Sequence, residues 1–242
     1  MSLLQKYNIQ IIYEDNHLIA VNKPAGWLVQ GDETGDVPIS EFVKEYIKKR
    51  YNKPGDVYLG IIHRLDRPVS GIVLFARTSK ALVRMNKLFQ DRMVDKQYVA
   101  VVEHRPQELE GTLVNYLSKD KDRNVTKAYT SQKYKSAKRS ELHYKYLGGL
   151  ADHHLLQVSP TTGRSHQIRV QLAKMGSVIK GDKKYGAAHF NTDRGTIHLH
   201  AYQLSFMHPV KKEQVIIEAD LPEKDQVWQM YAELIPYAPF GR

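Results

Sequence analysis

The chain has 242 residues and 27.9 kDa, and its 36 Lys and Arg exceed its 26 Asp and Glu, giving a formal net charge of +10. A composition of 42% hydrophobic and 26% charged residues is ordinary for a globular protein and excludes a mainly disordered chain. The absence of Cys excludes disulfides, thiolate metal sites and cysteine nucleophiles, while the positive charge favours anionic partners, nucleic acid first among them.

The sequence shows neither a membrane-spanning segment nor an export signal. The longest apolar runs, such as residues 71–76, are far shorter than the roughly 20 residues that a membrane helix needs. Polar residues interrupt the first 16 positions before the apolar region of a signal peptide could form. We therefore expect a cytoplasmic protein that does not contact a membrane.

The first hundred residues alternate between strand and helix patterns. Ser40 and Ser79 each precede apolar side chains at helical spacing, so each is predicted to be a helix N-cap. The segment between the apolar runs at 57–62 and 71–76 is polar and predicts a loop. Strands are predicted at 17–21, 57–62, 71–76 and 96–103, and helices at 40–50 and 79–89.

After residue 112 the pattern changes to short strands with two further helices. Gly176 is placed to close one helix, and Pro222 fits the first turn of the other. Strands are predicted at 141–147, 155–158, 197–206 and 214–219, and helices at 165–175 and 222–234.

The most basic stretch lies between Ser118 and Arg139. It holds eight Lys and Arg against two Asp, with Tyr129 and Tyr134 interleaved. Such a run is either a solvated surface arm or a surface that contacts phosphates and stacks on bases, and the charge of the whole chain favours the second interpretation. The candidate RNA-binding residues in it are Lys127, Lys133, Lys135, Lys138 and Arg139.

A candidate catalytic loop is formed by residues 63–71 (HRLDRPVSG). Asp66 stands between Arg64 and Arg67, and a carboxylate beside guanidinium groups is favoured in the ionised form that a nucleophile or base requires. A purely structural ion pair would give the same pattern, so the residue types alone leave both interpretations open.

A second constellation is formed by residues 162–169 (TGRSHQIR), a turn that leads into a helix. Arg164 precedes the helix and Arg169 lies inside it, while Ile168 belongs to its apolar face. Free backbone N–H groups and a guanidinium converge at such a turn, which suits phosphate or carboxylate binding. A helix cap with surface arginines is the alternative.

The sequence gives little support for a metal or cofactor site. His198 and His200 alternate on a predicted strand and could form a metal pair, but no third ligand is suggested nearby. The chain contains no P-loop, GxGxxG or GxSxG sequence, so we expect neither a metal nor a cofactor.

Several segments, in chain order, resemble the RluA-type RNA pseudouridine synthases. They extend from about residue 13 to 220, and their number and order make the resemblance specific. They are residues 13–26 (YEDNHLIAVNKPAG), 63–71 (HRLDRPVSG), 96–100 (KQYVA), 162–169 (TGRSHQIR), 181–186 (GDKKYG), 199–201 (LHA) and 208–209 (HP).

The resemblance implies that the protein isomerises uridine in structured ribosomal or transfer RNA. Asp66 corresponds to the essential catalytic carboxylate, Tyr98 to the residue placed against the base, and Arg164 to the partner of the carboxylate. Ile168 matches an apolar position that walls the uracil pocket. From the same segments we take His63, Arg64 and Arg169 as substrate-binding residues.

The resemblance also implies an α+β fold with a long, mixed but mainly antiparallel sheet, flanking helices and a central catalytic cleft. We expect a single catalytic domain over residues 1–242, without the N-terminal S4 domain of many members, working as a monomer without an obligatory protein partner. Val69 departs from the family pattern, in which Thr is expected before Ser70, but this change leaves Asp66 in place.

Two other functions remain open from the sequence. The chain could be a non-catalytic RNA-binding module of the same fold, although Asp66, Tyr98 and Arg164 are all present. Alternatively, Asp66 could be the nucleophile of a hydrolase acting on nucleosides or sugars.

Overall fold

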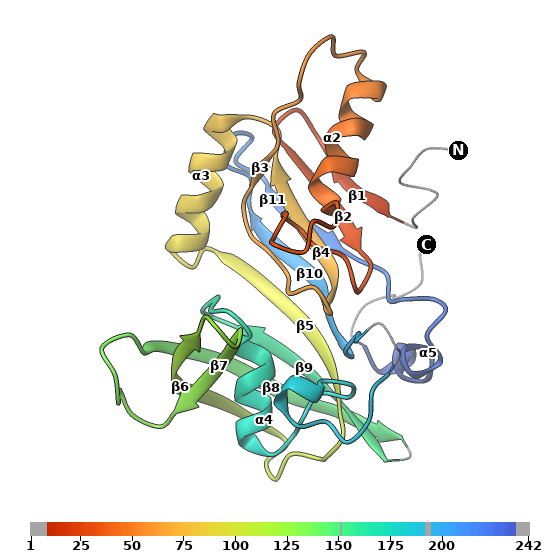
Figure 1. The fold of residues 1–242 in the computed structure, drawn as a ribbon. Helices are drawn as coiled ribbons and strands as arrows, with labels where there is room; N and C mark the ends of the chain where they lie inside the picture. Colours follow the sequence, from red (N-terminus) through yellow and green to blue (C-terminus); the bar gives the residue numbers. More distant parts are fainter. Residues whose placement is uncertain (1–8, 151, 192–194, 236–242) are drawn as a thin grey trace. The chain divides into compact units, whose positions relative to one another are not determined.

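The computed structural model describes residues 9–150, 152–191 and 195–235 (Figure 1). These residues form two compact units, each assembled from two stretches of the chain. Unit 1 comprises the described residues up to Asp95 together with Tyr202–Asp220, and unit 2 comprises Lys96–Ala201 and the described residues from Leu221 onward. The boundaries fall inside two strands, β5 (Val94–Val102) and β10 (Leu199–Met207).

Unit 1 is a sheet flanked by two helices. In it β1, β2, β4 and β10 lie side by side in that order, with β3 beside β4 and β11 beside β10. The β1–β2, β2–β4, β3–β4 and β10–β11 pairs are antiparallel. The elements are β1 (Gln10–Glu14), β2 (Leu18–Lys23), α2 (Ile39–Arg50), β3 (Gly60–Ile61), β4 (Ser70–Ala76), α3 (Ser79–Gln90) and β11 (Gln214–Glu218).

The core of unit 1 follows from strand periodicity. Side chains at alternate positions of β2 and β4 point to one face of the sheet, where they pack with Ala81 and Met85 of α3. Every residue of β4 is buried, as expected of an inner strand covered on both faces. The members of this cluster from the strands are Leu18, Ala20, Ile72, Leu74, Ala76, Val94, Leu204, Phe206, Val215 and Ile217.

Both predicted N-caps in unit 1 are wrong by one or two residues. The N-cap of α2 is Pro38, and the Ile39 N–H donates to the Leu28 carbonyl at 2.8 Å, so a neighbouring loop replaces a capping side chain. Ser40 lies inside the first turn and is buried. The N-cap of α3 is Thr78, whose Oγ1 accepts from the Ala81 N–H at 3.1 Å because Thr78, one residue before Ser79, has the extended backbone of a cap.

Unit 2 is an antiparallel sheet with α4 and α5. Its strands lie in the order β5, β9, β8, β6, β7, and each neighbouring pair is antiparallel. The elements are β6 (Glu110–Asp120), β7 (Val125–Tyr129), β8 (Lys138–Leu150), β9 (His153–Pro160), α4 (Gln167–Met175), α5 (Gln226–Tyr231) and two short 3-10 helices, Lys183–Tyr185 and Ala232–Leu234.

The helix ends in unit 2 confirm one prediction and correct another. Gly176 closes α4 with a left-handed φ of 97°, as predicted. Pro222 does not open α5, because the carboxylate of Asp225 caps that helix by accepting from the Val227 and Trp228 N–H groups. The strand predicted at 57–62 is also shorter than expected, since only β3 pairs with a neighbour. Within the described ranges, none of the helices has the length and apolar character needed to cross a membrane.

Candidate active site

The predicted site residues fall on both units. His63, Arg64 and Asp66 lie in the loop between β3 and β4 of unit 1. Unit 2 holds Tyr98 on β5 and Arg164 in the turn before α4.

Buried side chains and a backbone hydrogen bond fix the loop that carries Asp66. Leu65 and Val69 are buried, and the Val69 N–H donates to the Asp66 carbonyl at 3.0 Å, which closes a tight turn. Asp66 itself is half-buried. The carboxylate is therefore presented by a short turn whose apolar neighbours fix it to the core of unit 1.

A second loop, which follows β2, locks onto this turn. The Gly26 N–H donates to the Arg67 carbonyl at 2.8 Å, and Arg67 Nε donates back to the Gly26 carbonyl at 3.0 Å. Gly26 has a φ of 89°, which glycine adopts without strain. The Arg67 guanidinium also pairs with Asp36 at 2.7 Å, so Arg67 joins three loop segments.

Lys23 holds the two loops together from inside the protein. Its side chain is fully buried, and Nζ donates to the carbonyls of Pro24 at 3.1 Å, Trp27 at 2.9 Å and Arg67 at 3.2 Å. Burial lowers the pKa of Lys23 to about 7, with the nearby Asp66 charge raising it and Arg67 lowering it. The sequence prediction assigned no role to this lysine, although it lies in one of the segments that carry the family resemblance.

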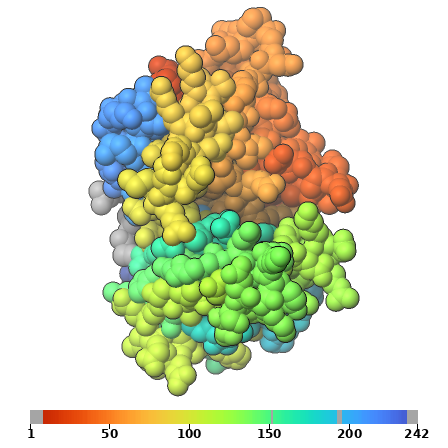
Figure 2. Space-filling model, turned by 90° about the vertical axis from the view of Figure 1, so that its left-hand side faces the viewer, coloured from red at the N-terminus to blue at the C-terminus, as the bar shows by residue number. Residues whose placement is uncertain are grey.

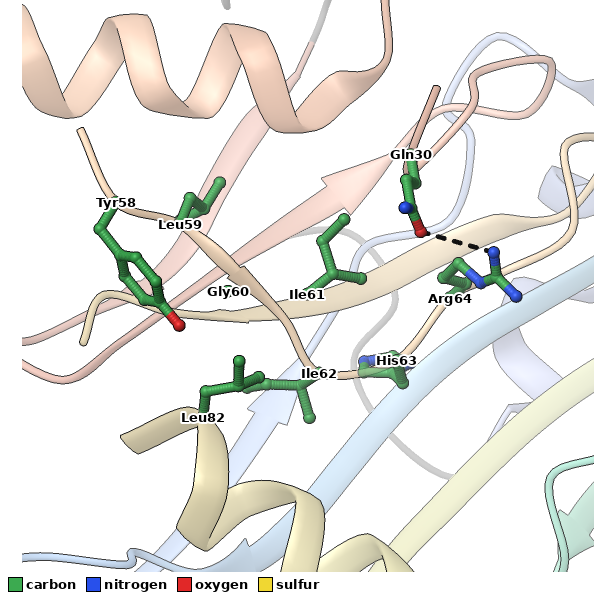
Figure 3. A pocket seen from close by; sticks show the side chains of 9 residues that line it. All are labelled: Gln30, Tyr58, Leu59, Gly60, Ile61, Ile62, His63, Arg64 and Leu82. Carbon is green, nitrogen blue, oxygen red and sulfur yellow. Dashed lines mark hydrogen bonds between the residues drawn. The ribbon is translucent and has the colours of Figure 1, made fainter. Parts of the chain in front are cut away.

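His63 and Arg64 border a pocket on unit 1. His63 Nε2 accepts from the Leu74 N–H of β4 at 3.1 Å, and its ring stacks on Phe89 with centroids 5.2 Å apart. Arg64 is exposed, and its Nη1 donates to Gln30 Oε1 at 3.5 Å. The pocket has a volume of about 500 Å³ and is lined by Gln30, Tyr58, Leu59, Gly60, Ile61, Ile62, His63, Arg64 and Leu82 (Figure 3).

In unit 2, the turn before α4 is fixed by a network around Gln167. Its Oε1 accepts from Thr162 Oγ1 at 2.7 Å and from the Arg164 N–H at 3.0 Å, while its Nε2 donates to the Glu141 carbonyl at 3.0 Å. The backbone of Arg164 belongs to this network, but its side chain is exposed to solvent. The backbone before α4 is therefore fixed while the guanidinium of Arg164 faces outward.

Arg169 is buried in an ion pair. Its Nε and Nη2 donate to the two carboxylate oxygens of Asp182 at 2.7 and 2.8 Å, and both side chains are at most 5% exposed. Its guanidinium also lies 5.1 Å from the ring centre of Tyr185, whose hydroxyl is 2.7 Å from His166 Nδ1. These contacts join two of the family segments, and direct contact of Arg169 with a substrate stays a prediction.

Tyr98 lies on β5 opposite Val158 of β9 and is half-buried. Two residues earlier, Lys96 Nζ donates to the Thr162 carbonyl at 3.4 Å. The segment that carries Tyr98 is thus bonded to the turn that carries Arg164. Ile168, on the first turn of α4, is buried.

The basic stretch forms the β6–β7 and β7–β8 connections and adjoining strand ends of unit 2, drawn in green in Figure 2. Tyr134 packs edge-on against Tyr129 with centroids 5.3 Å apart, and Lys133 Nζ lies 5.9 Å from the Tyr134 ring centre. Arg139 pairs with Glu141 at 2.5 Å. The five candidate RNA-binding side chains, Lys127, Lys133, Lys135, Lys138 and Arg139, are all exposed.

The two histidines considered as a metal pair have other surroundings. His198 contacts Asn191 through Nδ1 at 2.6 Å and Asp225 through Nε2 at 3.1 Å. His200 is fully buried beside Trp228. The part of the chain that the structure describes contains no group of three His, Asp or Glu side chains arranged to hold a metal ion.

Comparison with known proteins identifies the family. Residues 17–174 match the family model described as RNA pseudouridylate synthase. The chain is 34% identical to tRNA pseudouridine synthase C of Yersinia pestis, over 91% of this chain and 88% of that protein. It is 29% identical to ribosomal large subunit pseudouridine synthase D of Zymomonas mobilis, over 92% of this chain and 72% of that protein.

Solved structures agree on the fold. Human RNA pseudouridylate synthase domain containing 4 superimposes with a TM-score of 0.73 at 23% identity, over 88% of each chain. Human RNA pseudouridylate synthase domain containing 1 gives a TM-score of 0.70 at 23% identity, over 97% of each chain. The predicted α+β fold is thereby confirmed, and the chain belongs to the RNA pseudouridylate synthase family.

Proposed function

We propose that this protein converts uridine to pseudouridine in a structured transfer or ribosomal RNA, with Asp66 as the catalytic carboxylate. The observation that carries the proposal is the position of Asp66, the one carboxylate of the HRLD segment, on a turn held by Lys23, Arg67 and the buried Leu65 and Val69. A rigidly supported, half-buried carboxylate is what a nucleophile or base in a closed site needs.

The reaction needs no external reactant. The bond from C1′ of the ribose to N1 of uracil breaks, the base turns, C5 bonds to C1′, the hydrogen on C5 leaves as a proton, and N1 takes up a proton, so that atoms and charge balance. Asp66 attacks the sugar or the base, or removes a proton from the sugar. Because nothing is oxidised, reduced or hydrolysed overall, the proposed reaction requires neither a cofactor nor a metal.

Tyr98, Arg164 and Ile168 keep the roles that the family resemblance gives them. Tyr98 would stack on the uracil, Ile168 would wall its pocket, and the exposed guanidinium of Arg164 would balance the charge of the carboxylate. To reach Asp66 the uridine has to leave its stack, at a cost of a few kcal/mol. The exposed basic stretch of unit 2 would supply part of the binding energy through phosphate contacts. We further propose that the protein acts as a monomer in the cytoplasm.

Tritium release from RNA labelled at C5 of uridine tests the proposal, because forming the C5–C1′ bond expels that hydrogen. Unmodified tRNA and rRNA transcripts are incubated with the wild-type protein, with Asp66→Asn and with Asp56→Asn, which removes an exposed carboxylate elsewhere in unit 1. We expect release by wild type and Asp56→Asn and at least a 1,000-fold loss in Asp66→Asn, about 4 kcal/mol of transition-state stabilisation.

The results separate the alternatives. Full release by Asp66→Asn would overturn the catalytic assignment, while RNA binding without release from any transcript would favour the non-catalytic module. Free uracil accumulating with turnover would indicate a hydrolase.

A further inference from the structure

The pocket on unit 1 lies beside the loop that carries Asp66. Figure 3 shows Tyr58 and Leu82 at one end, Gln30 and Arg64 at the other, and the side chains of Ile61 and Ile62 between them. Its volume of about 500 Å³ falls in the range of small-molecule sites.

Local structure holds the ends of the pocket in place. Gly60 lies so close to Leu82 and Tyr58 that an added Cβ would stand 3.0 Å from the side-chain tip of each. The glycine therefore lets both side chains lie against the β3 backbone. At the other end the His63 ring is fixed by the Leu74 N–H and by stacking on Phe89.

The lining has the chemistry of a nucleotide site. Tyr58 is 46% exposed and offers an aromatic surface, and stacking on such surfaces is how proteins bind unpaired RNA bases. The Gln30 amide, beside Arg64, can donate to a phosphate oxygen and accept from a ribose hydroxyl. The exposed guanidinium of Arg64 can bind a phosphate.

The surface next to the pocket favours a polyanion. Leu82 comes from α3, whose twelve residues include no acidic residue. Lys80 and Arg84 are exposed on this helix, which faces the viewer in yellow in Figure 2, while Lys87 pairs with Asp91 at 2.7 Å. RNA is thus a better match for this surface than a neutral small molecule.

The chain itself limits the distance from the Arg64 end of the pocket to Asp66. Arg64 precedes Asp66 by two residues, so their Cα atoms are at most about 7 Å apart. That is about the length of one extended nucleotide, so a nucleotide whose phosphate binds Arg64 is adjacent to the one at Asp66, and its base can extend along the pocket toward Tyr58.

We propose that this pocket binds an unstacked nucleotide next to the target uridine, with its base on Tyr58 at one end and its phosphate at Gln30 and Arg64 at the other. The assignment rests on the proposed function and adds a second recognition point to it. Target choice would then depend on a neighbouring base as well as on the uridine itself.

The test measures C5 tritium release from a stem-loop around the uridine that the wild-type protein modifies, and from copies with an abasic nucleotide on either side of it. On the complete RNA we expect Tyr58→Ala to lower kcat/KM about 10-fold, mainly through KM, as loss of one stacked base predicts. On the RNA lacking the bound base, wild type and Tyr58→Ala should agree. Tyr58→Phe, which keeps the ring, should behave as wild type.

Tyr51→Ala is the matched control, because Tyr51 is a similarly exposed tyrosine of unit 1 outside the pocket. Equal kinetics of wild type and Tyr58→Ala on the complete RNA would overturn the proposal. A loss that persists unchanged on both abasic RNAs would overturn it as well, since the effect would not come from a base. If wild type releases no tritium from any transcript, the proposed function itself fails, and the pocket assignment falls with it.

Discussion

Lys23 shows how one residue can organise two loops at the scale of a single side chain. A lysine ammonium has three N–H donors and no acceptor, and three carbonyl oxygens surround Nζ of Lys23, from Pro24, Trp27 and Arg67. Those carbonyls belong to the loop after β2 and to the turn that carries Asp66. The buried amine therefore acts as a positioning group for the carboxylate.

Replacing Lys23 should change both the stability and its dependence on pH. Lys23→Met removes the N–H groups that face three carbonyls. At pH 9 the folded lysine is a neutral amine that keeps two of these N–H groups, and we expect the free energy of unfolding to fall by about 2–4 kcal/mol at that pH. The wild-type lysine has a pKa near 10.5 when unfolded and about 7 when folded, so between these values the unfolded chain binds more protons. Its contribution to stability therefore rises with pH from about 7 to 10.

Urea titrations of both proteins between pH 6 and 10 measure this difference. We expect wild type to gain stability relative to Lys23→Met as the pH rises, by at most about 1.4 kcal/mol per pH unit. Tyr13 has its pKa raised to about 12 by burial and the nearby Asp15, which reduces stability only above pH 10. Lys80→Met, which alters an exposed lysine of the same unit, is the control. A difference that stays constant with pH would contradict the prediction.

At the scale of elements, the end of α4 depends on a glycine in the left-handed region. Gly176→Ala should lower the free energy of unfolding by about 1 kcal/mol, because its φ of 97° strains a residue with a Cβ. No atom lies within 4 Å of the added Cβ, so the cost is conformational. Gly55→Ala, which has equal space and no left-handed φ, should be neutral or slightly stabilising in the same urea titration.

Elements with strong periodicity could be predicted from the sequence, but their exact ends could not. Strand β4 and helix α4 were expected nearly where they lie, because an apolar run and a closing glycine are local signals. The start of α2 was not, since its first N–H bonds to the Leu28 carbonyl of another segment. Both Thr78 and Ser79 can cap a helix, and only the backbone angles decide between them.

Likewise, some residues of the candidate site could be predicted from the sequence and others could not. Asp66, Tyr98 and Arg164 could be selected from short motifs, whereas the role of Lys23 depends on where three carbonyls meet in space. The buried ion pair between Arg169 and Asp182 could not be predicted from the sequence either, because the two residues lie in separate segments. Pocket residues such as Tyr58 and Gln30 have no motif at all.

At the scale of the whole molecule, the positive charge should govern how RNA binding responds to salt. Replacing Lys133, Lys135 and Lys138 by Gln should reduce the slope of log K against log salt by about two, since each phosphate contact contributes about 0.7–0.9. Adding Arg139→Gln should change it less, because Glu141 already neutralises that residue.

Filter-binding or fluorescence titrations of a tRNA transcript at several salt concentrations measure the slope. The control replaces Lys48, Lys49 and Lys53, exposed lysines in and just after α2, and removes the same charge outside the basic stretch. Equal slopes for the two triple variants would show that the basic stretch makes no special contact with RNA.

Because unit 1 is built from two separate stretches of the chain, it cannot complete its fold early during synthesis on the ribosome. The cluster that includes Ile72 and Leu74 of β4 also needs Leu204, Phe206 and Val215, and roughly 100 residues of unit 2 are translated in between. At about 5–20 residues per second this delay is about 5–20 s. The turn carrying Asp66 is thus synthesised before the core beneath it can be completed, and Ile72 and Leu74 lack part of their packing during that interval.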